Sequence, residues 1–181
     1  MKKRLARFCR LRYNRIRRGK EALCVVNSLM VANNVLQRAK RDGIEDVSPM
    51  KLQKLVYLIY ARYLYLGGQP LFLNRFEVWK HGPVEREMYN YFGRFGGRPI
   101  RDTFAEINGK RLCVDEDASP LFKKVLDEVW ERYKYDEAWK LSEMTHEDGS
   151  AWHKMRQNDS WYIDVTEIRE DGRRFFDEKI S

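Results

Sequence analysis

A stretch that is apolar nearly all round lies between Ser48 and Gly68. Ser48-Pro49 has the pattern of a helix start, because serine caps free N–H groups and proline at the first helical position needs no hydrogen-bond partner. Apolar and aromatic side chains then occupy both sides of the predicted helix, until Gly67-Gly68 ends it. A helix without a polar face is normally buried on every side. The sequence therefore predicts a domain built around this helix.

Other segments have the one-sided apolar pattern of helices that cover a core. They are 21–41 closed by Gly43, Pro83 to Phe95, a helix capped by Ser119-Pro120, and shorter pieces around 137–145, 151–157 and 166–178. We expect a short strand from Arg75 to Trp79. Asn108-Gly109 between two strand-like runs predicts a hairpin, because both turn positions need positive φ. The expected fold class is mainly α (α+β), a compact helical domain with a small antiparallel element of two or three short strands.

The formal charge of +8 is distributed unevenly along the chain. Residues 1–20 hold ten of the 35 basic residues and no acid, whereas residues 21–181 hold 25 basic and 27 acidic side chains. We therefore expect a basic N-terminal extension, 1–20, and a single domain, 21–181. The extension could bind nucleic acid by releasing counterions from phosphates. Its alternatives are a solvated tail or coding sequence upstream of a natural start near Met30. The candidate nucleic-acid contacts are Arg4, Arg7, Arg10, Arg12, Arg15, Arg17 and Arg18.

The sequence lacks the usual patterns of catalytic and metal sites. No GxSxG, GxxxxGK or GxGxxG motif occurs, and the three cysteines have no paired metal spacing. "THEDGSAWH" brings His146 and His153 near acids, but Ser150 has the pattern of a helix cap rather than of a metal site. We expect no enzymatic activity, no metal and no cofactor. Without an apolar run of about 18 residues, we expect a cytoplasmic protein with no membrane partner.

Three motifs occur in the order found in the Panacea antitoxin domain, the SocA-like or phage-associated GepA-like family. They are "SPMKLQKLVYLIYARYLYLGGQPLF" from Ser48, "FEVWKHGPVEREMYNYF" from Phe76 and "LSEMTHEDGSAWH" from Leu141. The resemblance covers roughly residues 28–176. Two positions depart from the family pattern: Ala151 stands where proline is common before the tryptophan, and Glu85 where an apolar residue or proline is common.

The resemblance implies a function in a toxin–antitoxin pair. Members of the family are small, mostly helical and non-enzymatic, and they neutralise a protein toxin encoded beside them by direct binding. One member instead works as an adaptor that delivers its toxin to the ClpXP protease. The resemblance therefore predicts an antitoxin, with a proteolytic adaptor or a DNA-binding regulator acting through residues 1–20 as alternatives.

The segment around Gly82-Pro83 is the candidate interaction surface. We expect Gly82 to form a tight corner and Pro83 to start a helix, which would hold the preceding Trp79 and His81 in place. Aromatic residues with a polar handle are favoured at protein interfaces. The predicted toxin-binding residues are Lys54, Tyr57, Trp79 and His81. The alternative is that Trp79 belongs to the core and His81 is a satisfied hydrogen-bonding group.

Overall fold

The structure, a computed structural model, describes residues 9–11 and 26–177. Within these residues the chain forms seven α-helices and two small antiparallel strand pairs, so the predicted mainly helical fold is confirmed. The helices are α1 (Ser28–Asp42), α2 (Pro49–Gly67), α3 (Arg86–Phe92), α4 (Pro120–Tyr133), α5 (Ala138–His146), α6 (Ala151–Gln157) and α7 (Val165–Asp177). The strands are β1 (Cys9–Leu11), β2 (Phe76–Trp79), β3 (Gly82–Glu85), β4 (Glu106–Ile107) and β5 (Lys110–Val114).

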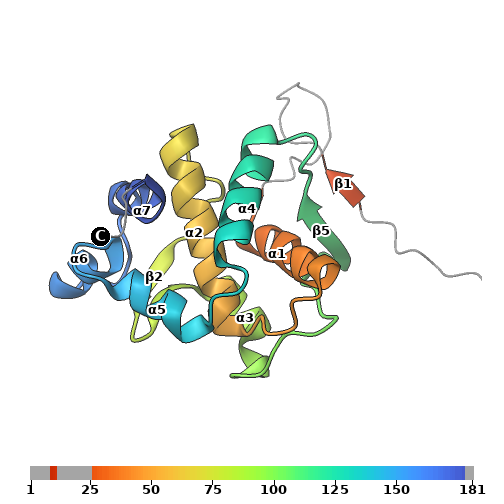
Figure 1. Cartoon of the computed structure of the whole chain (residues 1–181), viewed down its shortest axis with the longest axis horizontal. Coiled ribbons are helices and arrows are strands. Elements are labelled where there is room, and N and C mark those ends of the chain that lie inside the picture. The colour runs from red at the N-terminus through yellow and green to blue at the C-terminus, as the bar shows by residue number, and fades with distance from the viewer. Residues whose placement is uncertain (1–8, 12–25, 178–181) are drawn as a thin grey trace, which may run out of the picture.

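Helix α2 is the centre of the molecule. The Ser48 hydroxyl accepts from the Lys51 N–H, Pro49 begins the helix, and Gly68 ends it in the left-handed conformation at φ 70°. Helices α1, α4, α5 and α7 all pack against α2, which lies between α7 and α4 (Figure 1). Most of its residues are buried, and every residue from Lys51 to Arg62 is, as its continuous apolar pattern predicts. None of the described helices is long and apolar enough to cross a membrane.

Helix α1 begins later than the sequence pattern indicates. The predicted start at residue 21 is wrong for the described part of the chain, because Asn27 is extended and its side chain accepts from the Met30 N–H at 3.0 Å. Residues 21–25 lie outside the described residues. The predicted end is confirmed by Gly43, which adopts φ 69° and donates its N–H to Ala39. A polar side chain before the apolar run therefore sets the helix boundary.

The hairpin predicted at Asn108-Gly109 is confirmed. These residues adopt φ 51° and 70° between β4 and β5, and β1 adds a parallel neighbour to β5. Two adjacent asparagines of α1 fix the hairpin to the core. The Asn33 side chain bonds the backbone of Ala105 and Leu112, and the Asn34 side chain bonds both backbone groups of Val114. These contacts satisfy backbone groups that would otherwise be buried without partners.

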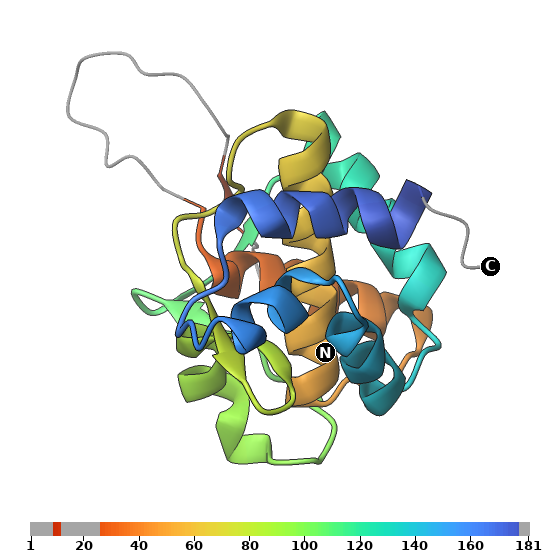
Figure 2. The same cartoon turned by 90° about the vertical axis from the view of Figure 1, so that its left-hand side faces the viewer.

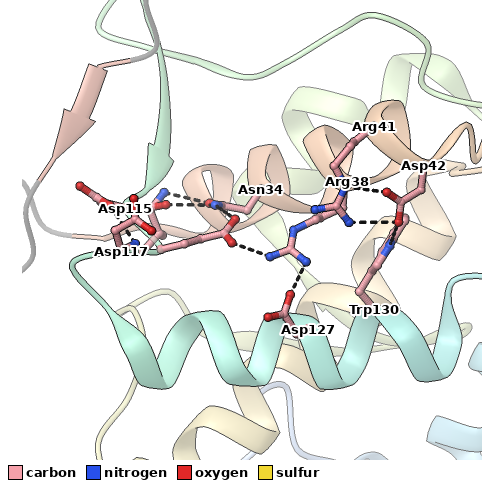
Figure 3. A network of polar contacts seen from close by, with 10 residues as sticks. Asn34, Arg38, Arg41, Asp42, Asp115, Asp117, Asp127 and Trp130 are labelled. Carbon is pink, nitrogen blue, oxygen red and sulfur yellow. Dashed lines mark hydrogen bonds and ion pairs between the residues drawn. The ribbon is translucent and has the colours of Figure 1, made fainter.

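Helices α1 and α4 are joined by charged groups as well as by apolar packing. The buried Arg38 guanidinium lies between Asp127 of α4 and Glu116, and it forms an ion pair with each (Figure 3). At the end of α1, Asp42 accepts a hydrogen bond from Trp130 Nε1 at 2.7 Å. Both partners of each interaction come from segments distant in sequence, so the ion pairs fix how the helices sit against each other.

Helix α7 crosses α2 at close range (Figure 2). A Cβ added at Gly172 would lie 2.1 Å from the Ala61 carbonyl oxygen, so the two backbones meet where only glycine fits. Beside this crossing, the Tyr57 hydroxyl of α2 donates to Asp171 of α7 at 2.5 Å. Burial raises the pKa of Tyr57 well above its usual value. The crossing places α7 directly over the central helix.

Candidate protein-binding groove

A tight hairpin made by β2 and β3 forms one wall of the candidate site. The strands pair antiparallel from Phe76 opposite Glu85 to Trp79 opposite Gly82. At Gly82 the backbone has φ 96°, and an added Cβ would lie 2.7 Å from both Lys54 Nζ and Thr145 Oγ1. Glycine is therefore required at this corner both for its conformation and for the space it leaves.

The expected helix start at Pro83 is wrong. Pro83 lies inside β3, and α3 begins three residues later at Arg86. The reason is Glu85, whose carboxylate accepts from the backbone N–H groups of Glu87 and Met88, both at 2.9 Å. A second contact to this carboxylate comes from the Ser28 hydroxyl at 2.6 Å. Glu85 thus caps α3, which a proline or apolar residue at this position could not do.

Side chains of α2 complete the free edge of β3. Gln53 donates to the Glu85 carbonyl and accepts from its N–H, both at 2.9 Å, as a neighbouring strand would. One residue further along, Lys54 Nζ donates to the Pro83 carbonyl at 3.0 Å. Because an unpaired strand edge invites association with other strands, these bonds close that edge to β-strand addition.

The rest of the hairpin is held by the C-terminal segments. Val78 N–H donates to the Trp161 carbonyl at 3.0 Å, and Glu77 forms an isolated antiparallel bridge with Tyr162. Trp152 Nε1 donates to the Trp79 carbonyl at 2.9 Å, and the Ser142 hydroxyl donates to the His81 carbonyl at 3.0 Å. The hairpin turn is therefore fixed through its backbone, and the side chains of Lys80 and His81 at the turn are exposed.

A groove of about 270 Å³ opens between this hairpin, the start of α2 and helix α3. The described residues that line it are Pro49, Met50, Gln53, Lys54, Trp79, Lys80, His81, Val84, Tyr89, Gly93 and Gly96. The Trp79 and Tyr89 rings pack with their centroids 4.6 Å apart, and the Arg86 guanidinium lies 5.4 Å from the centroid of the Trp79 ring. The groove thus combines apolar walls with basic groups.

Buried Glu77 fixes the orientation of Trp79. Its carboxylate accepts from Trp79 Nε1 at 2.7 Å and from both Arg86 nitrogens, Nε at 2.7 Å and Nη2 at 2.6 Å. Burial acts against the charged carboxylate, but the hydrogen bonds from Arg86 and Trp79 lower the pKa of Glu77. An ionised Glu77 holds the indole in one orientation, so the aromatic wall of the groove is preorganised.

Three of the four predicted site residues meet in this groove. Lys54, Trp79 and His81 line it, although Lys54 lies more than twenty residues before Trp79 and His81 in the sequence. Tyr57 does not reach the groove, because its side chain is fully buried between α2 and α7 and its hydroxyl bonds Asp171. One turn of helix separates Tyr57 from Lys54, but a helix buried on every side directs neighbouring residues into different parts of the core.

Ala151 begins α6, and its N–H donates to the buried Asp171 carboxylate at 3.0 Å. A proline at this position would have no N–H to donate. Burial raises the pKa of Asp171 to about 6, although the hydrogen bonds from Tyr57 and Ala151 act in the opposite direction. Asp171 joins α2, α6 and α7 behind the groove, and nothing in its local sequence indicates this.

The predicted cap at Ser150 is confirmed, since its hydroxyl accepts from the His153 N–H at 3.1 Å. Within residues 9–11 and 26–177, no group of three or more His, Cys, Asp or Glu is arranged to hold a metal ion. Of the arginines predicted to contact nucleic acid, Arg10 lies in β1 and the others lie outside the described residues. Nucleic-acid binding by the extension stays a prediction.

Fold and site together define a small, mainly helical protein with an apolar groove beside its hairpin. The chain matches the family of antitoxin SocA-like proteins with a Panacea domain over residues 52–153, and it belongs to this family. The matched span contains the hairpin, α3 and most of α2. Antitoxin SocA of Caulobacter vibrioides (strain NA1000 / CB15N) is 28% identical over 130 residues, which cover 70% of this chain and 69% of that protein. No solved structure matches the chain.

Proposed function

We propose that this protein is an antitoxin that neutralises a cognate protein toxin by binding it directly. The observation that carries the proposal is membership of the SocA-like antitoxin family over a span that includes most of the groove residues. The curated relative is itself named an antitoxin. An antitoxin of this kind needs a surface that is complete before the toxin arrives, since ordering a surface on binding costs affinity.

The groove has the properties expected of such a surface. Half-buried Trp79 and partly exposed Tyr89 supply rigid aromatic area next to basic groups, and aromatic residues dominate the binding energy of many interfaces. The backbone around Trp79 and His81 is fixed by Trp152 and Ser142, so little conformational freedom remains to be lost. We place the toxin contact at Trp79, His81 and Lys54.

Co-expression tests the proposal. The gene that neighbours this one is expressed alone and together with the protein, and growth and co-purification are scored in the same cells. We expect the neighbour to arrest growth alone, and the pair to grow and to purify as a stable complex. If the cells grow without a complex and the neighbour's protein disappears, the protein delivers the toxin to ClpXP rather than neutralising it by binding. A toxic neighbour that this protein does not counteract would refute the proposal.

A further inference from the structure

Four basic side chains are buried among the described residues, and three of them have carboxylate partners. Arg38 pairs with Glu116 and Asp127, and Arg62 pairs with Glu128 and Asp177. Lys51 and Lys54 are the other two, one turn apart on α2. A buried charge normally requires a partner of opposite sign, because removal from water costs several kcal/mol.

The two lysines differ in this respect. Lys51 Nζ donates to both oxygens of Asp46, at 2.9 and 2.8 Å, and to the Lys134 carbonyl at 2.8 Å. Lys54 is only 1% exposed, yet its Nζ makes a single hydrogen bond, to the Pro83 carbonyl, and no ion pair with any residue from 26 to 177. An ammonium group carries three donors, so Lys54 retains unused capacity to donate.

The groups that face Lys54 do not supply the missing negative charge. His146 of α5 interacts electrostatically with Lys54 and with His81 of the hairpin turn. Thr145 of α5, which like Lys54 lies close to Gly82, is neutral. Burial lowers the pKa of Lys54 to about 7, and burial followed by Lys54 and His81 lowers the pKa of His146. His146 Nε2 is also buried without a hydrogen-bond partner among the described residues. Among the described residues, the cluster of Lys54, His81 and His146 therefore contains groups that can carry positive charge and no negatively charged group.

Lys54 differs from an ordinary buried lysine because it lines an open groove. The groove walls are mostly apolar, through Met50, Trp79, Val84 and Tyr89, and no acidic residue is among the described residues that line it. Lys80 adds a second ammonium at the hairpin turn. The charge and shape of the groove are thus complementary to a negatively charged group attached to an apolar one.

We propose that the groove receives an acidic side chain of the toxin, whose carboxylate pairs with Lys54 while an adjacent apolar group packs on Trp79 and Tyr89. This inference rests on the proposed function for the identity of the partner. The carboxylate would give Lys54 the counter-charge that Asp46 already gives Lys51. Charge-assisted bonds of this kind are about twice as strong as neutral ones.

The chemistry of the groove can be tested without the toxin, by NMR titration of the whole protein with phenylacetate and with phenylacetamide. The two probes share a ring and differ in charge. We expect phenylacetate to bind about tenfold more tightly and to shift the Trp79 indole signal, because only the acid pairs with Lys54. Equal affinities, or no binding of either probe at the groove, would overturn the inference. This comparison needs no variant.

Lys54→Met should abolish the preference for the acid, whereas Lys123→Met, on the exposed face of α4, should retain it. A preference that survives in a folded Lys54→Met protein would overturn the inference.

In the complex, replacing the toxin's acidic residues one at a time by amides should weaken binding at one position at least tenfold, and Lys54→Met should cancel that effect. Toxin binding without any such position overturns the inference and leaves the proposed function intact. Acid preference without toxin binding would refute the proposed function, and with it the toxin as the partner that supplies the acidic group.

Discussion

His81 lies at the exposed turn of the β2–β3 hairpin, with its backbone rather than its side chain fixed to the fold. His81→Ala should therefore lower toxin affinity about tenfold, the scale of one good interface contact, and shift the melting temperature by only about 1 °C. Calorimetric titration with the toxin and thermal unfolding measure the two effects. A lowered melting temperature with unchanged affinity would make His81 a structural residue.

Lys54 should make stability depend on pH above neutrality. Its pKa is about 7 in the fold and about 10.5 when unfolded, so the unfolded chain binds more protons between these values. The wild-type free energy of unfolding should therefore rise with pH across this window, by an amount on the order of a few kcal/mol. Lys54→Met should lack this rise.

Urea unfolding at about pH 7 and about pH 9.5, on both proteins, measures the difference. Lys123→Met serves as the control, because it removes an exposed lysine and should follow the wild type. Parallel pH curves for the wild type and Lys54→Met would show that Lys54 keeps an ordinary pKa in the fold.

At the residue scale, sequence reasoning found the groove residues Lys54, Trp79 and His81 but misplaced Tyr57. Spacing along a helix shows which residues are neighbours, and a helix with a single apolar face also shows which side is buried. Helix α2 has no such face, so only tertiary contacts decide that Lys54 lines the groove and Tyr57 meets Asp171.

At the scale of elements, local signals predicted most boundaries. The predicted helix start is found at Ser48-Pro49, the helix ends at Gly43 and Gly68, and the hairpin turn at Asn108-Gly109. The helix start predicted at Pro83 is wrong because proline suits both a helix start and a strand position whose N–H is not needed. Gln53 and Lys54 select the strand by bonding its edge, and these contacts lie about thirty residues away in sequence.

The close crossing of α2 and α7 requires a residue without a side chain at position 172. In Gly172→Ala the new Cβ would clash with the Ala61 carbonyl, which cannot move without shifting α2. We expect a loss of about 3 kcal/mol in the free energy of unfolding, the upper range for overpacking. Gly93→Ala is the matched control, since its Cβ would make ordinary contacts beyond 3.7 Å and its φ is −57°.

Urea unfolding of the two alanine variants measures the difference. The control should be neutral or slightly stabilising, because alanine reduces the freedom of the unfolded chain. Equal stabilities for Gly172→Ala and Gly93→Ala would mean that α2 and α7 do not meet as closely as described.

At the scale of the whole molecule, the net positive charge comes from residues 1–20, which hold ten basic residues and no acidic ones. Replacing their seven arginines by glutamine should weaken binding to duplex DNA and flatten its dependence on salt, because fewer counterions are released. Fluorescence anisotropy at several salt concentrations measures both. Toxin affinity should stay unchanged, since the described residues that line the proposed groove all come from outside the extension. If the wild type and the arginine-to-glutamine variant bind DNA with the same salt dependence, the extension does not contact the DNA phosphates.

The central claim is that binding alone neutralises the toxin. The most direct measurement is growth of cells that express the toxin and this protein in a host lacking ClpXP, compared with the same pair in a host that has the protease. If binding alone neutralises the toxin, rescue should be equal in both hosts and the complex should be recovered from each. Rescue that disappears without ClpXP would contradict this claim and show that the protein acts by delivering the toxin for degradation.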